Sequence, residues 1–388
     1  KRPRRHGSPG APRLGQFVRQ RQRLVIQADG VLQLAGRIAD VRLRRREAQP
    51  EAEAVEAVRP EENGKEDLRG FDPSRPYLLQ FPSALRGTPE VTDLIHGIRQ
   101  VRNSLVANIG LTLPPFEVEL DDSLAVDEMR FCVHEVPMVR ASVVNHVAVE
   151  RKALTVEPEH AIPGLAERDE QDWLWLPPDD PLLDDPQLER FTATQLSLER
   201  MRQAMMLSGP QFLGIQESKA ILSWLEHNQP ELVQELQRIM PISRFSAVLQ
   251  RLAGEGVPLR AVRLIVESLI EYGQHEREPE ALADYARIAL KSQILHQYSE
   301  ADGLHAWLLS PQTENTLREA LRQTQTRVFF ALDNDNSAAL INLLNQAFTV
   351  RAKSKSVMLV AQDLRSPLRT LLIEEFNHVP VLSFAELG

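Results

Sequence analysis

The sequence holds a single cysteine, Cys132, and aromatic residues make up 5% of its 388 positions. One cysteine excludes a disulfide within the chain and a metal cluster built on cysteines. Aliphatic side chains must therefore fill the cores, and a hydrophobic content of 43% is ample for two to four domains. No window approaches 18 uncharged apolar residues, so no membrane-spanning helix is predicted. The basic N-terminal segment lacks the apolar core of a signal peptide.

The motifs of common catalytic sites are also missing. In GPQFLGIQES (209–218), Pro210 removes an amide donor and no Lys-Ser/Thr pair follows, so a phosphate loop is not predicted. Glu217, early in a helix, is better explained by the helix dipole than by acid–base catalysis. The acidic run at 179–185 lacks the ligand pattern of a calcium loop, and DNDN at 333–336 is typical of a helix start. We therefore predict no enzyme, no cofactor and no metal.

Charge is unevenly distributed along the chain. Residues 1–60 contain 14 Lys and Arg against 6 Asp and Glu, a net charge of +8, whereas the whole chain is −9 and the remainder is therefore −17. An acidic body disfavours nucleic-acid binding, because phosphates require a basic surface. We interpret residues 1–70 as a basic, irregular linker or leader, with a segment lying beside anionic lipid as the alternative. Within it, the Asp-Gly pair in residues 23–41 favours a short hairpin.

Order is predicted to begin near Phe71. YLLQF (77–81) has the pattern of a buried strand, and the apolar spacing of residues 89–110 predicts a helix between Pro89 and Gly110. Residues 113–120 resume as a strand, and MRFCVHEVPMVRASVV (129–144) predicts strand, tight turn and strand. The order of these segments favours an α/β unit with a β-rich insertion.

Residues 191–298 have a helical pattern throughout. The helix in SRFSAVLQRLAGEG is expected to start at a Ser243 cap and to end at Gly254. The next one is expected to run from Pro258 to Gly273. Short amphipathic helices joined by short loops must stack to bury their apolar faces, which favours a compact helical superhelix.

The last ninety residues alternate between strands and helices. Strands are predicted at 326–332, 356–361 and 379–384, with a helix opened by Ser337 and another at 366–376 between them. Right-handed crossovers would make such a sheet parallel, so this region is expected to form a separate α/β domain.

Several motifs together resemble the cytoplasmic domain of the type III secretion export gate, a family shared by virulence injectisomes and the flagellar export machinery. They are FLGIQESKAILSWLE (212–226), IRQVRNSLVANIGLTLPPFEV (98–118), the Tyr-x-Arg-x-x-Leu-Lys spacing at 285–291 and the C-terminal segment from residue 356. The resemblance covers roughly residues 72–388. Ser142–Asn145 stand where flagellar members present an acidic and aromatic patch, which favours an injectisome member.

The resemblance implies a fold of α/β plus α class in four subdomains. The first is a thioredoxin-like or α+β unit, followed by a β-rich insert, a helical superhelix and a C-terminal α/β unit. The implied boundaries are 71–122 with 167–190 for the first unit, 123–166 for the insert, 191–298 for the helices and 299–388 for the last unit. The first unit would include the WLWL strand, whose two tryptophans fit a core, with the rim of a peptide groove as the alternative.

The resemblance also implies a function and partners. The chain would be part of a membrane-anchored protein at the cytoplasmic face of the bacterial inner membrane, assembled as a ring of nine copies. Chaperone–effector complexes, the gatekeeper, the export-apparatus stalk and the ATPase complex would dock on this ring, with no nucleic acid involved. The alternatives are a ring-forming scaffold or adaptor that binds no substrate, and an enzyme with an unrecognised site.

Two sets of candidate residues follow, both as expectations. Apolar side chains around the insert could receive a chaperone: Phe131, Val136, Met138, Val143, Val144, Trp173 and Trp175. Basic side chains of the helical and C-terminal units could face acids on the next copy in the ring: Arg251, Arg260, Arg263, Arg287, Lys291, Arg365 and Arg369.

Overall fold

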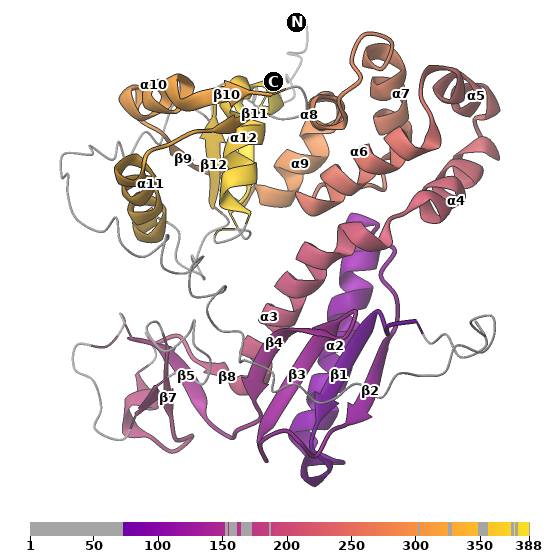
Figure 1. Cartoon of the computed structure of the whole chain (residues 1–388). Coiled ribbons are helices and arrows are strands. Elements are labelled where there is room, and N and C mark those ends of the chain that lie inside the picture. Colours follow the sequence, from indigo (N-terminus) through magenta and orange to yellow (C-terminus); the bar gives the residue numbers. More distant parts are fainter. Residues whose placement is uncertain are drawn as a thin grey trace, which may run out of the picture. The chain divides into compact units, whose positions relative to one another are not determined.

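A computed structural model describes residues 73–151, 154, 161–163, 173–185, 188–301, 303–324, 328–347, 356–373, 376 and 379–387. These residues divide into two compact units, one ending at Ala289 and the other beginning at Leu290 (Figure 1). The linker expected at 1–70 and its hairpin lie outside the described residues. Within the described part of the chain, no helix is long and apolar enough to cross a bilayer.

A four-stranded mixed sheet opens the first unit. Its strands are β1 (Tyr77–Phe81), β2 (Phe116–Leu120), β3 (Glu128–Val133) and β4 (Val136–Ser142), in the order β2-β1-β3-β4. Strand β1 pairs with β2 in parallel and with β3 in antiparallel orientation, and β3 continues into β4 as a hairpin. A short 3-10 helix, η3 (Ser83–Leu85), follows β1. The predicted strand–turn–strand at 129–144 is confirmed.

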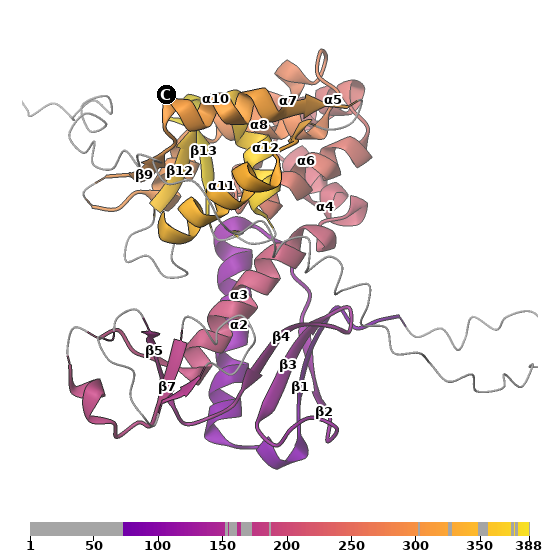
Figure 2. The ribbon, with the colours of Figure 1, turned by 60° about the vertical axis from the view of Figure 1, so that its left-hand side comes forward.

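Helix α2 (Pro89–Ile109) forms where the sequence predicts it. The Thr88 side chain accepts from the backbone amide of Val91, Pro89 occupies the first turn, and Gly110 ends the helix in the left-handed conformation at φ 85°. Its buried stripe includes Leu94 and Ile98. Helix α3 (Ala193–Ser208) lies beside α2 and also contacts β4 (Figures 1 and 2). Helix α3 therefore connects the first sheet, through β4, to helix α2.

A second sheet has the order β6-β7-β5-β8. It contains β5 (Val147–Glu150), β6 (Ile162–Pro163), β7 (Trp173–Leu176) and β8 (Phe191–Thr192), and a 3-10 turn, η5 (Pro181–Asp184), follows β7. Strand pairing places residues 128–142 in the first sheet and residues 173–176 in the second. The division into four subdomains, with its boundaries, stays a prediction.

Helices complete the first unit. They are η6 (Gly209–Phe212), α4 (Ile215–Glu226), α5 (Pro230–Ile239), α6 (Ile242–Gly254), α7 (Val262–Tyr272) and α8 (Pro279–Ala289). Contacts of α6 with α4 and α8, and of α7 with α5 and α8, produce the stacked arrangement that the amphipathic pattern predicts (Figure 1).

Two of the expected helix starts in the first unit are wrong. Helix α6 begins at Ile242 with Pro241 as its N-cap, so Ser243 lies inside the first turn instead of capping it. Helix α7 begins at Val262, four residues after Pro258. The first helical hydrogen bonds mark both starts: the Pro241 carbonyl accepts from the Phe245 amide, and the Ala261 carbonyl accepts from the Ile265 amide. The expected stops at Gly254 and Gly273 are confirmed as the last residue of α6 and the C-cap of α7.

The second unit contains α9 (Lys291–Tyr298) and a three-stranded parallel sheet of order β13-β12-β9. Its strands are β9 (His305–Leu308), β12 (Ser356–Val360) and β13 (Val381–Ser383). The remaining elements are α10 (Pro311–Ala320), β10 (Leu321–Gln323), β11 (Val328–Phe330), α11 (Asn334–Ala347), α12 (Gln362–Leu372) and η7 (Phe384–Glu386). The expected parallel sheet is confirmed.

The membership of that sheet differs from the prediction. The segment expected as its first strand, 326–332, instead contributes β11, which forms an antiparallel hairpin with β10. HAWL at 305–308 takes the place beside β12. Helix α11 starts at Asn334, where an Asp333 carboxylate oxygen accepts from the Asn336 amide, so Ser337 does not open it. DNDN thus starts a helix, as predicted.

Candidate functional site

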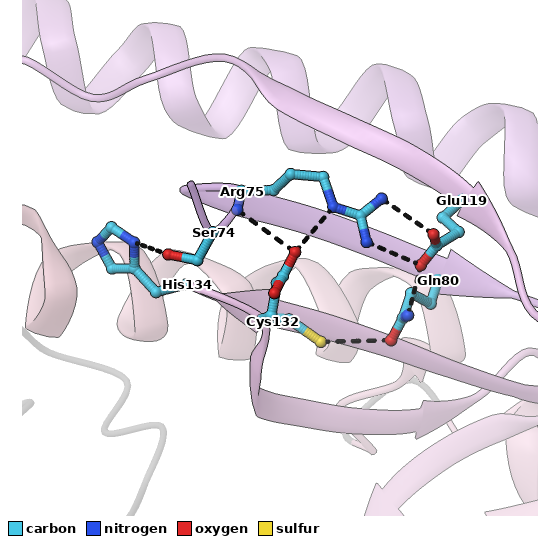
Figure 3. A network of polar contacts seen from close by, with 7 residues as sticks. Ser74, Arg75, Gln80, Glu119, Cys132 and His134 are labelled. Carbon is cyan, nitrogen blue, oxygen red and sulfur yellow. Dashed lines mark hydrogen bonds and ion pairs between the residues drawn. The ribbon is translucent and has the colours of Figure 1, made fainter. Parts of the chain in front are cut away.

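The turn between β3 and β4 has an unusual backbone. His134 and Glu135 are both in the left-handed region, at φ 48° and 66°, where residues other than glycine are uncommon. Neighbouring side chains hold both residues (Figure 3). The Ser74 hydroxyl is hydrogen-bonded to His134 Nδ1 at 3.2 Å, and the His134 ring stacks on Phe212 with centroids 5.2 Å apart. The turn is therefore held by a hydrogen bond with Ser74 and by ring stacking on Phe212.

Arg75 connects this turn to the opposite edge of the sheet. Its Nε donates to a Glu135 oxygen at 3.1 Å, while its two terminal nitrogens donate to both Glu119 oxygens at 2.9 and 3.3 Å. Gln80 also donates to Glu119, at 2.7 Å. The bonds from Arg75 and Gln80 lower the pKa of Glu119. Figure 3 shows the network running over β2, β1 and β3, and it fixes the hairpin relative to the rest of the sheet.

Cys132, a free and buried cysteine, lies at the end of this network. Its Sγ is 3.5 Å from Gln80 Oε1, and burial raises the pKa of the thiol. A protonated, buried thiol is a poor nucleophile and a poor metal ligand. In the part of the chain that the structure describes, no three histidine, cysteine or acidic side chains group as a metal site would require. Its hydrogen bonds and ion pairs make the network a structural clamp on the β3–β4 turn.

The seven apolar candidates separate into exposed and buried members. Val136 and Met138, on the edge strand β4, are 58% and 43% exposed. Val143 and Val144 are half-buried. Phe131, Trp173 and Trp175 are buried. The expected patch is thus reduced to the outer part of β4, which the network described above holds in place.

The expectation of an exposed surface does not hold for the three buried aromatic residues, and packing explains why. Phe131 is buried, and its ring centroid lies 5.3 Å from that of Tyr77, whose hydroxyl is hydrogen-bonded to Ser208 of α3. Trp173 and Trp175 form a small core with Ala148, Ala193 and Leu196, against which Val144 also packs. The core interpretation of WLWL is confirmed, and the alternative of a groove rim is wrong.

Most of the basic candidates are engaged inside their own unit. Arg287 and Arg251 both pair with Glu255, at 2.9 and 2.8 Å. Arg365 lies 4.0 Å from Glu386, and Arg369 donates to the Val379 carbonyl at 3.0 Å.

A buried side chain cannot contact another copy. Three of the expected ring residues are buried and therefore do not lie on that surface: Arg287, Arg365 and Arg369. Of the others, Arg260 is exposed and donates to the Ala107 carbonyl at 2.8 Å. Arg263 and Lys291 are also exposed.

Sequence reasoning missed two features. Arg75 and Glu119 are 44 residues apart and meet only because β1 and β2 pair in parallel, so no local signal marks them. Trp224 is the second feature, because it is the only tryptophan in the described chain that is classed as exposed. A signal was present: in α4 the buried stripe runs through Ser218, Leu222 and Leu225, and Trp224 lies off it.

Comparison of the sequence and the fold with known proteins identifies the family that this chain resembles. The model of the FHIPEP family matches residues 22–388, which extends the similarity about fifty residues upstream of the resemblance at 72–388. The hypersensitivity response secretion protein HrpI of Pseudomonas syringae pv. syringae is 53% identical over 350 residues, covering 90% of this chain and 50% of that protein. The chain thus spans about half the length of the curated relatives it matches.

Solved structures have the same fold. The Chlamydia pneumoniae CdsV protein superposes with a TM-score of 0.65 at 25% identity, covering 81% of this chain and 95% of that one. The nonameric SctV-C of EPEC superposes with a TM-score of 0.62 at 25% identity, with the same coverage. The fold is therefore one that occurs in a ring of nine copies.

Proposed function

Because this chain belongs to the FHIPEP family, which contains type III secretion export gate proteins, we propose that it forms a cytoplasmic docking ring of such a gate. The ring receives chaperone–effector complexes and the gatekeeper and passes substrates to an export channel in the inner membrane. The observation that carries this proposal is the family match over residues 22–388, together with the likeness to a nonameric relative.

Assembly is the first part of the proposal. A closed ring repeats one head-to-tail contact, so a single pair of complementary surfaces on each copy is sufficient. The measurement is the particle mass of the purified 43.9 kDa chain over a concentration series. Particles of nine chain masses are expected. A chain that remains monomeric at its highest soluble concentration would contradict the ring.

Docking is the second part, and the outer edge of β4 is the surface we propose. Val136 and Met138 present exposed aliphatic and thioether groups, and methionine adapts to partners of different shape. The clamp of Ser74, Arg75 and Phe212 on the turn orders this edge before any partner arrives. Such preorganisation lowers the entropy lost on binding. An apolar segment of a chaperone is therefore the partner chemistry that fits.

The test replaces both side chains with a charged one, in Val136→Glu with Met138→Glu. A carboxylate placed in an apolar contact loses its water, and we expect about 2 kcal/mol of lost binding, or roughly 30-fold weaker capture. The probe is a purified chaperone–effector complex from the same secretion system, measured by calorimetry. Val126→Glu is the matched control, since Val126 is an exposed valine at the other end of β3.

The outcomes separate docking from assembly. Loss of capture in the double variant, with unchanged capture in the Val126 control and unchanged particle mass, supports β4 as the docking edge. Equal capture by all three proteins would move the docking site elsewhere on the ring. Loss of particle mass in the double variant would instead assign β4 to the contact between copies.

A further inference from the structure

A groove lies between α4, α5 and α6 of the first unit and encloses about 410 Å³. Its floor is apolar and its rim polar. The buried floor residues are Leu222, Leu236, Met240 and Phe245, and the exposed rim residues are Lys219, Ser223, Glu226 and Gln237. An apolar floor with a few polar groups around it is the form of site that holds an aromatic side chain.

Trp224 lies on the same helix and is 64% exposed. Of the other tryptophans, Trp173 and Trp175 are buried, and Trp307 packs against the core of the second unit. An exposed indole in the last turn of a helix leaves a large apolar surface in water, and tryptophan is one of the residue types enriched at the centres of protein interfaces. Trp224 therefore has the properties of an interface anchor.

The groove and Trp224 lie on opposite flanks of α4. Each residue turns a helix by roughly 100°, so the groove-lining positions 219, 222, 223 and 226 point on average roughly 150° away from position 224. The buried stripe of Ser218, Leu222 and Leu225 lies between the two flanks and faces the core. Neither feature can fill the other within one copy.

From this arrangement we infer that Trp224 of one copy of this chain occupies the α4–α6 groove of the next copy. The inference rests on the proposed ring, because a closed ring needs two different surfaces on each copy. Each copy in a closed ring meets one neighbour on either side, so its anchor and its groove would contact different neighbours. A second copy is thus the occupant that both features fit, with the apolar floor beneath the indole ring and Glu226 on the rim able to accept from the indole N–H.

Two variants at exposed positions test the anchor and the groove separately. Trp224→Ala removes the anchor and leaves the groove open. Ser223→Trp fills the groove from its own rim and leaves the anchor intact. We expect each variant alone to weaken the contact by about 30-fold and to lose the ring, as measured by particle mass. Thermal unfolding at the wild-type temperature confirms that each variant is folded.

Mixing the two variants gives the decisive readout. The open groove of Trp224→Ala accepts the anchor of Ser223→Trp, and neither partner can extend the chain further. The mixture is expected to stop at dimers of twice the 43.9 kDa chain mass.

Other outcomes overturn the inference, and each has a distinct meaning. A ring-forming wild type with a ring-forming Trp224→Ala refutes the anchor and leaves the proposed ring standing. Two monomeric variants whose mixture forms no dimers refute the pairing of anchor and groove. A monomeric wild type refutes the proposed ring and this contact together.

Discussion

The Glu255 carboxylate forms ion pairs with two arginine side chains of the helical segment. We expect its removal to lower the free energy of unfolding more than the removal of an exposed carboxylate does. Glu255 follows α6 and pairs with Arg287 of α8 at 2.9 Å and with Arg251 of α6 at 2.8 Å. The Glu255 and Arg287 side chains are only 4% and 3% exposed. Glu255→Ala would leave two guanidinium groups side by side without this carboxylate, one of them fully desolvated.

The expected loss follows from burial. Removing one partner of a buried ion pair costs about 3–5 kcal/mol, because the remaining charge stays out of water. The chain supplies a matched control in Arg263 and Glu267, which pair at 2.7 Å but are 63% and 41% exposed. An exposed pair contributes about 0.2–1 kcal/mol, so Glu267→Ala should change the stability little. The nitrogen–oxygen distance is nearly the same in the Glu255–Arg287 and Arg263–Glu267 pairs, so the two pairs differ mainly in burial.

The assay is urea unfolding followed by far-ultraviolet circular dichroism on both variants and the parent chain. We expect a much lower urea midpoint for Glu255→Ala and an almost unchanged one for Glu267→Ala. If Glu255→Ala lost less than about 1 kcal/mol, or no more than Glu267→Ala, the argument from burial would be refuted.

Two further predictions concern the sheet and the helical segment. The pKa of Glu119 is lowered by Arg75, so its contribution to stability is present above the unfolded value of about 4.3 and is lost as pH falls through the folded value. In Glu119→Gln the urea midpoint should therefore decrease less steeply than in the parent chain as the pH falls below about 4. Parallel pH profiles of the variant and the parent chain would contradict this. A Cβ at Gly214 would meet only the end of the Glu217 side chain, at 3.2 Å, so Gly214→Ala should be nearly neutral. At Gly273 it would lie 2.4 Å from a backbone carbonyl oxygen, so Gly273→Ala should lower the melting temperature clearly, and equal melting of the two variants would refute this steric argument.

Much of the fold could be predicted because its signals are local. Thr88, Pro89 and Gly110 delimit α2 through capping and backbone conformation, which depend on adjacent residues. Pairing of strands is not local in this sense. Residues 128–142 have the pattern of a hairpin wherever they are placed, and only the register of β1 with β3 assigns them to the first sheet. The same reason explains why HAWL rather than TRVFFAL completes the C-terminal sheet.

The candidate surfaces were harder to predict because exposure is a property of the packed chain. Val136 and Phe131 are both apolar residues of one hairpin, yet one is exposed and the other is packed against Tyr77. Arg263 and Arg287 look equally solvated in the sequence, but α6 covers the second one. At Gly214 the backbone amide donates to the Glu217 carboxylate, a contact that forms only when the chain has entered α4.

The sequence was sufficient to identify the family and to predict α2, the helices of residues 191–298 and several of the points where helices end. These follow from motifs, periodicity and capping, which act over a few residues. The tertiary structure alone decided which strands pair, which charges are buried, and that Trp224 and a groove flank the same helix. Those properties depend on residues far apart in the chain, because burial and charge pairing exist only once distant segments have packed together.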